Sequence, residues 1–196
     1  ECGAVDGIRN STCYSLEKNY NWNGICVEAN PYNFNELTKN RKAICVNNPL
    51  DNVSDKYVDF IITKSEWLCG IQKYTLNDPI KLEKFPDSYK IKETIKMKTI
   101  SLLDLLVKNN APNIIHYLSL DIEGAEYEVL KDFPFDKYKI LSISIECPNL
   151  KSICKSKYPN IQFTMENEFN YKTDLPSYKL LISKGFIEVK NPYNQN

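Results

Sequence analysis

Acidic and amide residues stand where the short apolar segments of this chain end. Each segment is expected to be a buried parallel strand, because short apolar runs bounded by turn residues are typical of such strands. In an open α/β sheet, ligands bind in the crevice at the carboxyl ends of the strands. The sequence therefore predicts that the strand-end residues line one crevice. They are Gly3, Asp6, Gly7, Glu28, Asn30, Asn47, Asn48, Asp121, Glu123, Glu126, Glu146 and Cys147.

The opening ECGAVDG turn does not fit a phosphate site. A dinucleotide-binding G-x-G-x-x-G motif placed on Gly3 would need glycine where Val5 and Ile8 stand, and no P-loop Gly-Lys-Ser or Gly-Lys-Thr is present. Asp6 in the turn would repel a pyrophosphate. Glu28, about twenty residues on, is placed to accept hydrogen bonds from both hydroxyls of a ribose. These features predict a nucleoside without phosphates, such as S-adenosylmethionine, whose sulfonium charge suits nearby carboxylates.

Three blocks of the sequence resemble the signature blocks of the FkbM-type methyltransferases, a branch of the class I S-adenosylmethionine-dependent enzymes. The blocks are ECGAVDG at 1–7, CVEANP at 26–31 and LSLDIEGAEYEVLKDFPF at 118–135. The resemblance runs from Glu1 to about Pro148. It implies a Rossmann-like fold, S-adenosylmethionine as cofactor, and methyl transfer to a hydroxyl oxygen of a sugar or another small molecule.

The resemblance also implies roles for individual residues. Glu28 would hold the ribose, Asn47 would lie by the adenine, and Asp121 and Glu123 would face the transferred methyl group. The opening turn would line the methionine part of the S-adenosylmethionine cofactor. The implied cofactor site consists of Glu1, Gly3, Ala4, Asp6, Gly7, Glu28, Ala29, Asn30, Asn47 and Asp121.

Methyl transfer to a hydroxyl needs a base, and strand-end carboxylates are the candidates. Asp121 and Glu123 would point to one face if the strand continues that far, and Glu146 is the third candidate. A structural alternative is that Glu123 and Glu126 stabilise the amino end of the next helix. Three such carboxylates could also hold Mg²⁺, although the favoured interpretation has no metal. His116, at the start of its strand, is expected to be structural.

Two other classes of function stay open. A member of this fold that binds the cofactor without turnover would serve as a binding or scaffold module. An NAD- or nucleotide-sugar-binding enzyme would need a phosphate site, which Asp6 disfavours. The acceptor is expected to be a small molecule or glycan, met by aromatic residues of the chain's middle segment such as Tyr57, Trp67 and Tyr74.

Strands and helices are predicted to alternate along the chain. Asn30 and Pro31 predict the start of a helix ending near Arg41, between strands at 24–28 and 42–46. Residues 50–98 interrupt the alternation, with a loop at 76–92. It resumes with a helix from Ser101, strands at 114–121 and 141–146, a helix from Ala125, a helix at 177–184 and a last strand at 186–189. The prediction is one domain, 1–196: a doubly wound, mostly parallel sheet with an insertion after the third strand.

Composition excludes several classes of protein. Lys and Arg number 25 against 25 Asp and Glu, so no basic excess indicates nucleic-acid binding. No apolar run reaches the roughly 18 residues that a membrane span requires. The seven cysteines form no Cys-x-x-Cys pair and several lie in apolar runs, which favours reduced core residues and a cytoplasmic protein. Because only Glu1 and Cys2 remain of the first strand, the natural chain is expected to extend upstream.

Overall fold

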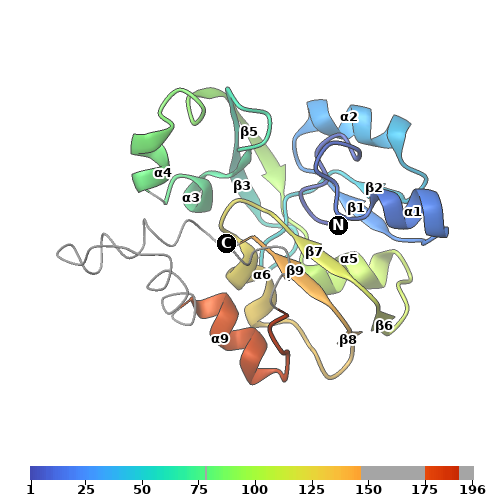
Figure 1. Cartoon of the computed structure of the whole chain (residues 1–196). Coiled ribbons are helices and arrows are strands. Elements are labelled where there is room, and N and C mark those ends of the chain that lie inside the picture. Colours follow the sequence, from blue (N-terminus) through green and yellow to red (C-terminus); the bar gives the residue numbers. More distant parts are fainter. Residues whose placement is uncertain (78, 147–174, 190–196) are drawn as a thin grey trace, which may run out of the picture.

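A computed structural model describes residues 1–77, 79–146 and 175–189 as a mixed α/β structure (Figure 1). The helices are α1 Tyr14–Tyr20, α2 Pro31–Asn40, α3 Gln72–Thr75, α4 Pro79–Lys84, α5 Leu102–Lys108, α6 Glu126–Lys131 and α9 Pro176–Ser183. The strands are β1 Ile25–Val27, β2 Ile44–Val46, β3 Tyr57–Thr63, β4 Gly70–Ile71, β5 Ile91–Lys98, β6 Ile114–Ile115, β7 Leu118–Leu120, β8 Lys139–Ile140 and β9 Ile143–Ile145.

Three pairs of short strands are parallel. β1 pairs with β2, β6 with β8, and β7 with β9. The connection between the two strands of each pair contains a helix, α2 in the first pair and α6 in the other two, as parallel pairing requires. The prediction of parallel strands is therefore confirmed for the described part of the chain, although the strands are shorter than expected.

Residues 1–4 join the two halves of the parallel arrangement. Cys2 forms parallel bridges to Val27 on one side and to Leu120 on the other. Its amide donates to the Ser119 carbonyl (2.9 Å), and its carbonyl accepts from the Asp121 amide (3.1 Å). The opening segment thus takes the place of a strand between β1 and β7, so that both strands end beside it.

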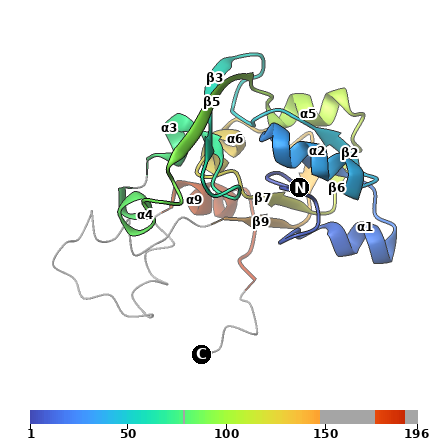
Figure 2. The same cartoon turned by 90° about the horizontal axis from the view of Figure 1, so that it is seen from above.

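Residues 50–98, the segment predicted to be an insertion and called the insertion below, contain a separate antiparallel sheet in the order β4–β3–β5. Viewed from above, β3 and β5 stand to one side of β7 and β9 (Figure 2). Helix α3 is held against the beginning of the insertion. Buried Asp51 accepts hydrogen bonds from the Tyr74 hydroxyl (2.8 Å) and the Lys73 ammonium (3.2 Å). This arrangement places the β3–β4 connection over the strand ends.

Local signals set the helix starts. The Asn30 side chain accepts from the Tyr32 amide, with Pro31 in the first turn, and the Ser101 side chain accepts from the Asp104 amide. Both predicted starts are confirmed. The main core lies between β7, α5 and α6, where Leu105, Leu120 and Leu130 are almost completely buried. The packing of β7, α5 and α6 around this core positions the loops that follow the strands.

Four local predictions were wrong. The segment 76–92 was expected to be a loop, but it contains α4 and the start of β5. The strand expected at 114–121 is broken into β6 and β7, and that at 141–146 is shortened to β9. Residues 186–189 form no strand, and Ile187 is 87% exposed. Apolar periodicity alone did not reveal these breaks, since they depend on contacts with distant segments.

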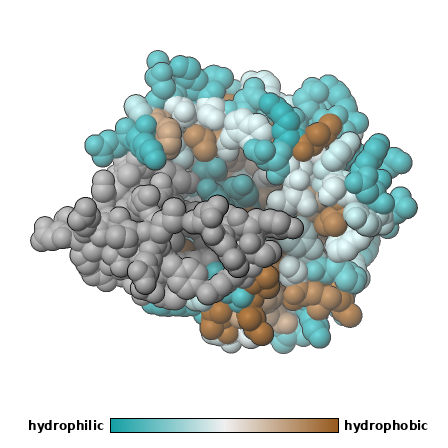
Figure 3. Space-filling view, in the orientation of Figure 1, coloured by the Kyte–Doolittle hydropathy of each residue, from teal (hydrophilic) through white to brown (hydrophobic). Residues whose placement is uncertain are grey.

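The surface on the face of Figure 1 is mostly hydrophilic, with brown hydrophobic areas in separate patches (Figure 3). Of the helices that the structure describes, none combines the length and the apolar character that crossing a bilayer would require.

Gly3 is required where the opening segment passes the end of β7. Its φ is +82°, a conformation that disfavours side chains, and an added Cβ would overlap the Asp121 carbonyl oxygen. We expect Gly3→Ala to lower the free energy of unfolding by roughly 2–4 kcal/mol in urea denaturation. Gly24→Ala is the matched control, since a Cβ there meets nothing within 4 Å. Equal stability of the two variants would contradict the close approach.

Candidate functional site

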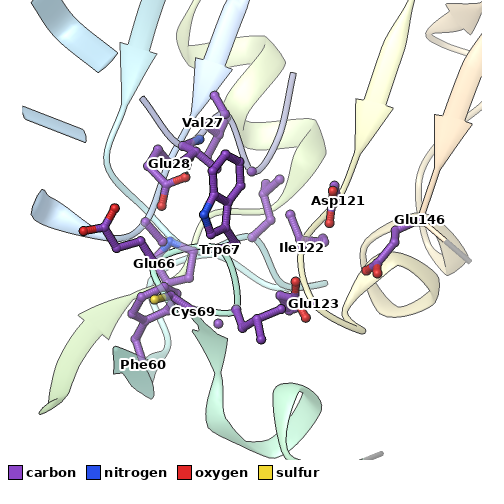
Figure 4. Close-up of a pocket in the computed structure, with 18 of the residues that line it drawn as sticks. Val27, Glu28, Phe60, Glu66, Trp67, Cys69, Asp121, Ile122, Glu123 and Glu146 are labelled. Atoms are coloured by element: carbon purple, nitrogen blue, oxygen red, sulfur yellow. Dashed lines mark hydrogen bonds between the residues drawn. The ribbon is translucent and has the colours of Figure 1, made fainter. Parts of the chain in front are cut away.

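A cavity of about 290 Å³ opens at the carboxyl ends of β1 and β7. Its walls come from the opening turn, the end of β1, the β3–β4 connection, and the loops after β7 and β9 (Figure 4). Seven predicted site residues line it: Gly3, Ala4, Glu28, Ala29, Asp121, Glu123 and Glu146. Residues at the ends of β1, β7 and β9 therefore do face one crevice.

Glu28 is a buried carboxylate held by backbone donors. Its Oε2 accepts from the Val5 amide and its Oε1 from the Asn30 amide, both at 2.7 Å. A carboxylate has about four acceptor positions, and these two bonds with a further backbone hydrogen bond from Ala29 leave at least one for a ligand. Burial raises the pKa of Glu28 to about 7, the negative charge of Asp121 adds to the rise, and the backbone hydrogen bonds oppose it. Glu28 can therefore change protonation state near neutral pH.

Three carboxylates converge at the other end of the cavity. Asp121, Glu123 and Glu146 each offer an oxygen atom, and these atoms all lie within 4.8 Å of one another. Glu123 is buried, Glu146 is half-buried and Asp121 is exposed. Such a group can take a proton from a hydroxyl or surround a cationic ligand. Its oxygen ligands are also of the type that Mg²⁺ binds.

The loop after β7 sets the direction of Glu123. The strand ends at Leu120, so the expectation that Asp121 and Glu123 share a face of a continued strand was wrong. Glu123 instead has φ +54° in a turn closed by Glu126, whose Oε1 accepts from the Ile122 amide at 2.9 Å. Gly70 of the insertion lies so close that an added Cβ would be 3.2 Å from the Glu123 Cβ. Glu126 thus has the structural role considered for it.

Sequence reasoning missed Arg9 as a residue of the cavity. Arg9 and Trp67 both line it, and the Arg9 guanidinium carbon lies 5.1 Å from the centre of the Trp67 ring. Arg9 also lies 3.7 Å from Glu66. Trp67 was considered only as one of several aromatic residues in the insertion. Of the others, Tyr57 is exposed at 66%, and Tyr74 donates to Asp51 instead of lining the cavity.

Five other residues of the predicted cofactor site have partners within the protein and do not line the cavity. The Glu1 carboxylate binds Arg41 at 2.7 Å, and an added Cβ at Gly7 would overlap Arg41. Asn30 caps α2, and Asn47 donates to the carbonyls of Glu28 (2.7 Å) and Ala29 (3.0 Å). These residues support the cavity walls. Any contact of theirs with a cofactor stays a prediction.

Asp6, the fifth of them, is paired with Arg9. Its Oδ2 lies 2.5 Å from Arg9 Nε, and its Oδ1 accepts from the amides of Ile8 and Arg9. Partial burial alone would raise the pKa of Asp6, but these hydrogen bonds lower it. The argument that a free acid in the turn repels pyrophosphate was therefore wrong. The carboxylates that line the cavity are Glu28, Glu66, Asp121, Glu123 and Glu146.

His116 lies away from this site. It lines a second cavity of about 530 Å³ that shares no residue with the first, and its ring contacts Trp22 at 5.8 Å. Cys2, Cys13, Cys26, Cys45 and Cys69 are all free thiols. Cys147 and Cys154 lie outside the described residues.

Comparison with known proteins agrees with the geometry. The family model for the methyltransferase FkbM domain matches residues 1–172 of the 196. The chain belongs to the FkbM methyltransferase family. No curated protein and no solved structure matched the chain. The matched range contains the opening turn, Glu28 and the three converging carboxylates, so family membership supports a methyltransferase.

The raised pKa of Glu28 predicts a pH-dependent stability. Between about pH 4.5 and 7 the folded state keeps the proton that the unfolded state has lost, so the free energy of unfolding falls as pH rises. From pH 5 to pH 8, we expect the free energy of unfolding measured in urea to fall by up to about 3 kcal/mol more for the wild type than for Glu28→Gln.

The control for this measurement is Glu36→Gln, because Glu36 is exposed on α2 and pairs with Lys39 at the surface. Its pH profile should follow that of the wild type. Parallel profiles of wild type and Glu28→Gln would contradict a raised pKa at Glu28.

Proposed function

We propose that the protein is an S-adenosylmethionine-dependent O-methyltransferase that acts on a hydroxyl of a sugar or another small molecule. One observation carries the proposal: Glu28 and the group of Asp121, Glu123 and Glu146 line opposite ends of a single cavity beside the opening turn. A ligand that spans this cavity has its ribose at Glu28 and its reacting group at the three carboxylates.

The residues present fit the cofactor by their chemistry. Glu28 keeps acceptor capacity for a ribose hydroxyl beside its backbone hydrogen bonds. Among the described residues, five carboxylates line the cavity, and the one guanidinium that lines it, that of Arg9, is paired with Asp6. This charge pattern favours a sulfonium cation and disfavours the diphosphate of NAD or of a nucleotide sugar.

The strand pairing supports a finer description of the fold. We propose that β2, β1, residues 1–4, β7 and β9 form, in that order, the parallel part of a Rossmann-like doubly wound sheet. We also propose a single domain over 1–196, with residues 50–98 as an insertion that closes the acceptor side of the cavity.

The proposed mechanism is an in-line displacement. The bound cofactor supplies a methyl group on a positively charged sulfur. The acceptor oxygen would bond to the methyl carbon as the carbon–sulfur bond breaks, and the electron pair of that bond would stay on sulfur. The hydroxyl proton passes to Asp121, Glu123 or Glu146, which face the same point. The protein's task is to align the acceptor, hold the proton acceptor beside it, and stabilise the cation before transfer.

Calorimetric titration separates this function from its alternatives. The proposal expects binding of S-adenosylmethionine and S-adenosylhomocysteine and no comparable binding of NAD. Tight binding of NAD alone would reject it. Cofactor binding without methylation, in a mass-spectrometric search of glycans and metabolites for a 14-dalton gain, would instead favour a non-catalytic binding module.

Removal of Glu28 should weaken cofactor binding. We expect Glu28→Ala to raise the dissociation constant of S-adenosylmethionine by on the order of 10-fold or more, because a charge-assisted hydrogen bond contributes about 1.5–3 kcal/mol. Glu36→Ala on α2, outside the cavity, should leave the constant unchanged. Thermal melting of both variants checks their folding. Unchanged affinity in folded Glu28→Ala would mean that the ribose is held elsewhere.

Removal of the base should slow transfer without a matching loss of cofactor binding. Among Asp121→Asn, Glu123→Gln and Glu146→Gln, we expect one variant to lower kcat by about 10²–10⁴-fold. Glu128→Gln is the control, because Glu128 pairs with Lys131 on α6 and does not line the cavity. Near wild-type kcat in all three variants would exclude a carboxylate base from this group.

A further inference from the structure

The indole ring of Trp67 stands between the two ends of the cavity. Figure 4 shows Glu28 on one side of the ring and Asp121, Glu123 and Glu146 on the other. Trp67 lines the cavity and keeps 36% of its surface exposed. A ligand that reaches from Glu28 to the three carboxylates therefore passes along this ring.

The ring already carries a cation. The Arg9 guanidinium carbon lies 5.1 Å from its centre, within the roughly 6 Å at which a cation is attracted to the negative face of an aromatic ring. Tryptophan is the strongest of the aromatic side chains in this interaction. The wall of the cavity thus contains a surface on which a positive charge is stabilised.

The backbone holds the Trp67 loop in place without a ligand. The Glu66 carbonyl accepts from the Asn33 side chain of α2 (3.1 Å), and the Ser65 amide donates to the Ser88 carbonyl (3.1 Å). The Leu68 amide donates a hydrogen bond to the Ser65 carbonyl (3.1 Å), which closes the turn. Because the loop is fixed on both sides of Trp67, little ordering is required when a ligand arrives.

We propose that Trp67 distinguishes the methyl-bearing cofactor from its spent form. The indole ring stabilises the sulfonium charge of S-adenosylmethionine, whereas the neutral thioether of S-adenosylhomocysteine receives no such stabilisation. The inference rests on the proposed function and adds a specificity-determining residue to that site. Methyl transfer removes the charge, so the ring favours binding before the reaction and release after it.

The test is the ratio of two dissociation constants, those of S-adenosylhomocysteine and S-adenosylmethionine, measured by calorimetry on the full chain. We expect Trp67→Leu to lower this preference for the charged form by roughly 3- to 30-fold. Trp67→Phe keeps an aromatic face and should retain most of the preference. Trp22→Phe is the control, because Trp22 contacts His116 beside the other cavity and should leave the ratio unchanged.

Several results would overturn the inference. If Trp67→Leu weakened the binding of both ligands equally, the ring would act only as a packing surface. An unchanged ratio with a raised KM for the acceptor would assign the ring to the acceptor. A ratio that falls in Asp121→Asn but not in Trp67→Leu would assign the discrimination to the carboxylates.

The proposed function fails in a different way. If the wild type binds neither ligand, the cofactor assignment is contradicted, and the role of Trp67 with it. If the wild type binds both but Trp67→Leu keeps the wild-type ratio, only the role of Trp67 is contradicted.

Discussion

Residues 1–4 hydrogen-bond to both β1 and β7, and this double pairing determines the distance between the two strand ends that form the site. Gly3 lets the segment pass against the Asp121 carbonyl, and the amides of Gly3 and Ala4 both donate to Val27 (2.9 and 3.0 Å). The Val5 amide can then reach Glu28. A side chain at Gly3 would separate the strands, and Glu28 would no longer face the same cavity as Asp121.

The electrostatics of the cavity follow from this arrangement. Bringing two strand ends together collects carboxylates that repel one another, as the influence of Asp121 on the pKa of Glu28 illustrates. Such a site is destabilised by repulsion while it contains no positive charge, and it is stabilised when a cation enters. Arg9 on the cavity wall supplies only part of that charge, because its guanidinium is paired with Asp6. A sulfonium ligand would supply the rest at the point where methyl transfer needs it.

Sequence reasoning could predict the residues whose roles are local. The Asn30 and Ser101 caps have short-range signatures, and Glu28 and Asp121 were predicted because each directly follows an apolar strand. The contact between Arg9 and Trp67 joins segments 58 positions apart and has no periodic signature. A turn at Glu123 and Gly124 could be predicted, but the direction of the Glu123 side chain could not, because it also depends on Gly70 of the insertion. Asp6 was expected to repel a pyrophosphate, but its pairing with Arg9 offsets its charge. The sequence alone did not reveal this pairing.

A crystal structure of the chain with S-adenosylhomocysteine tests the central claim most directly. The account predicts the ribose hydroxyls within hydrogen-bonding distance of the Glu28 carboxylate, and the sulfur on the side of Trp67 that faces Asp121, Glu123 and Glu146. A nucleoside bound in another cavity, or bound here with Glu28 left to its backbone donors alone, would contradict it.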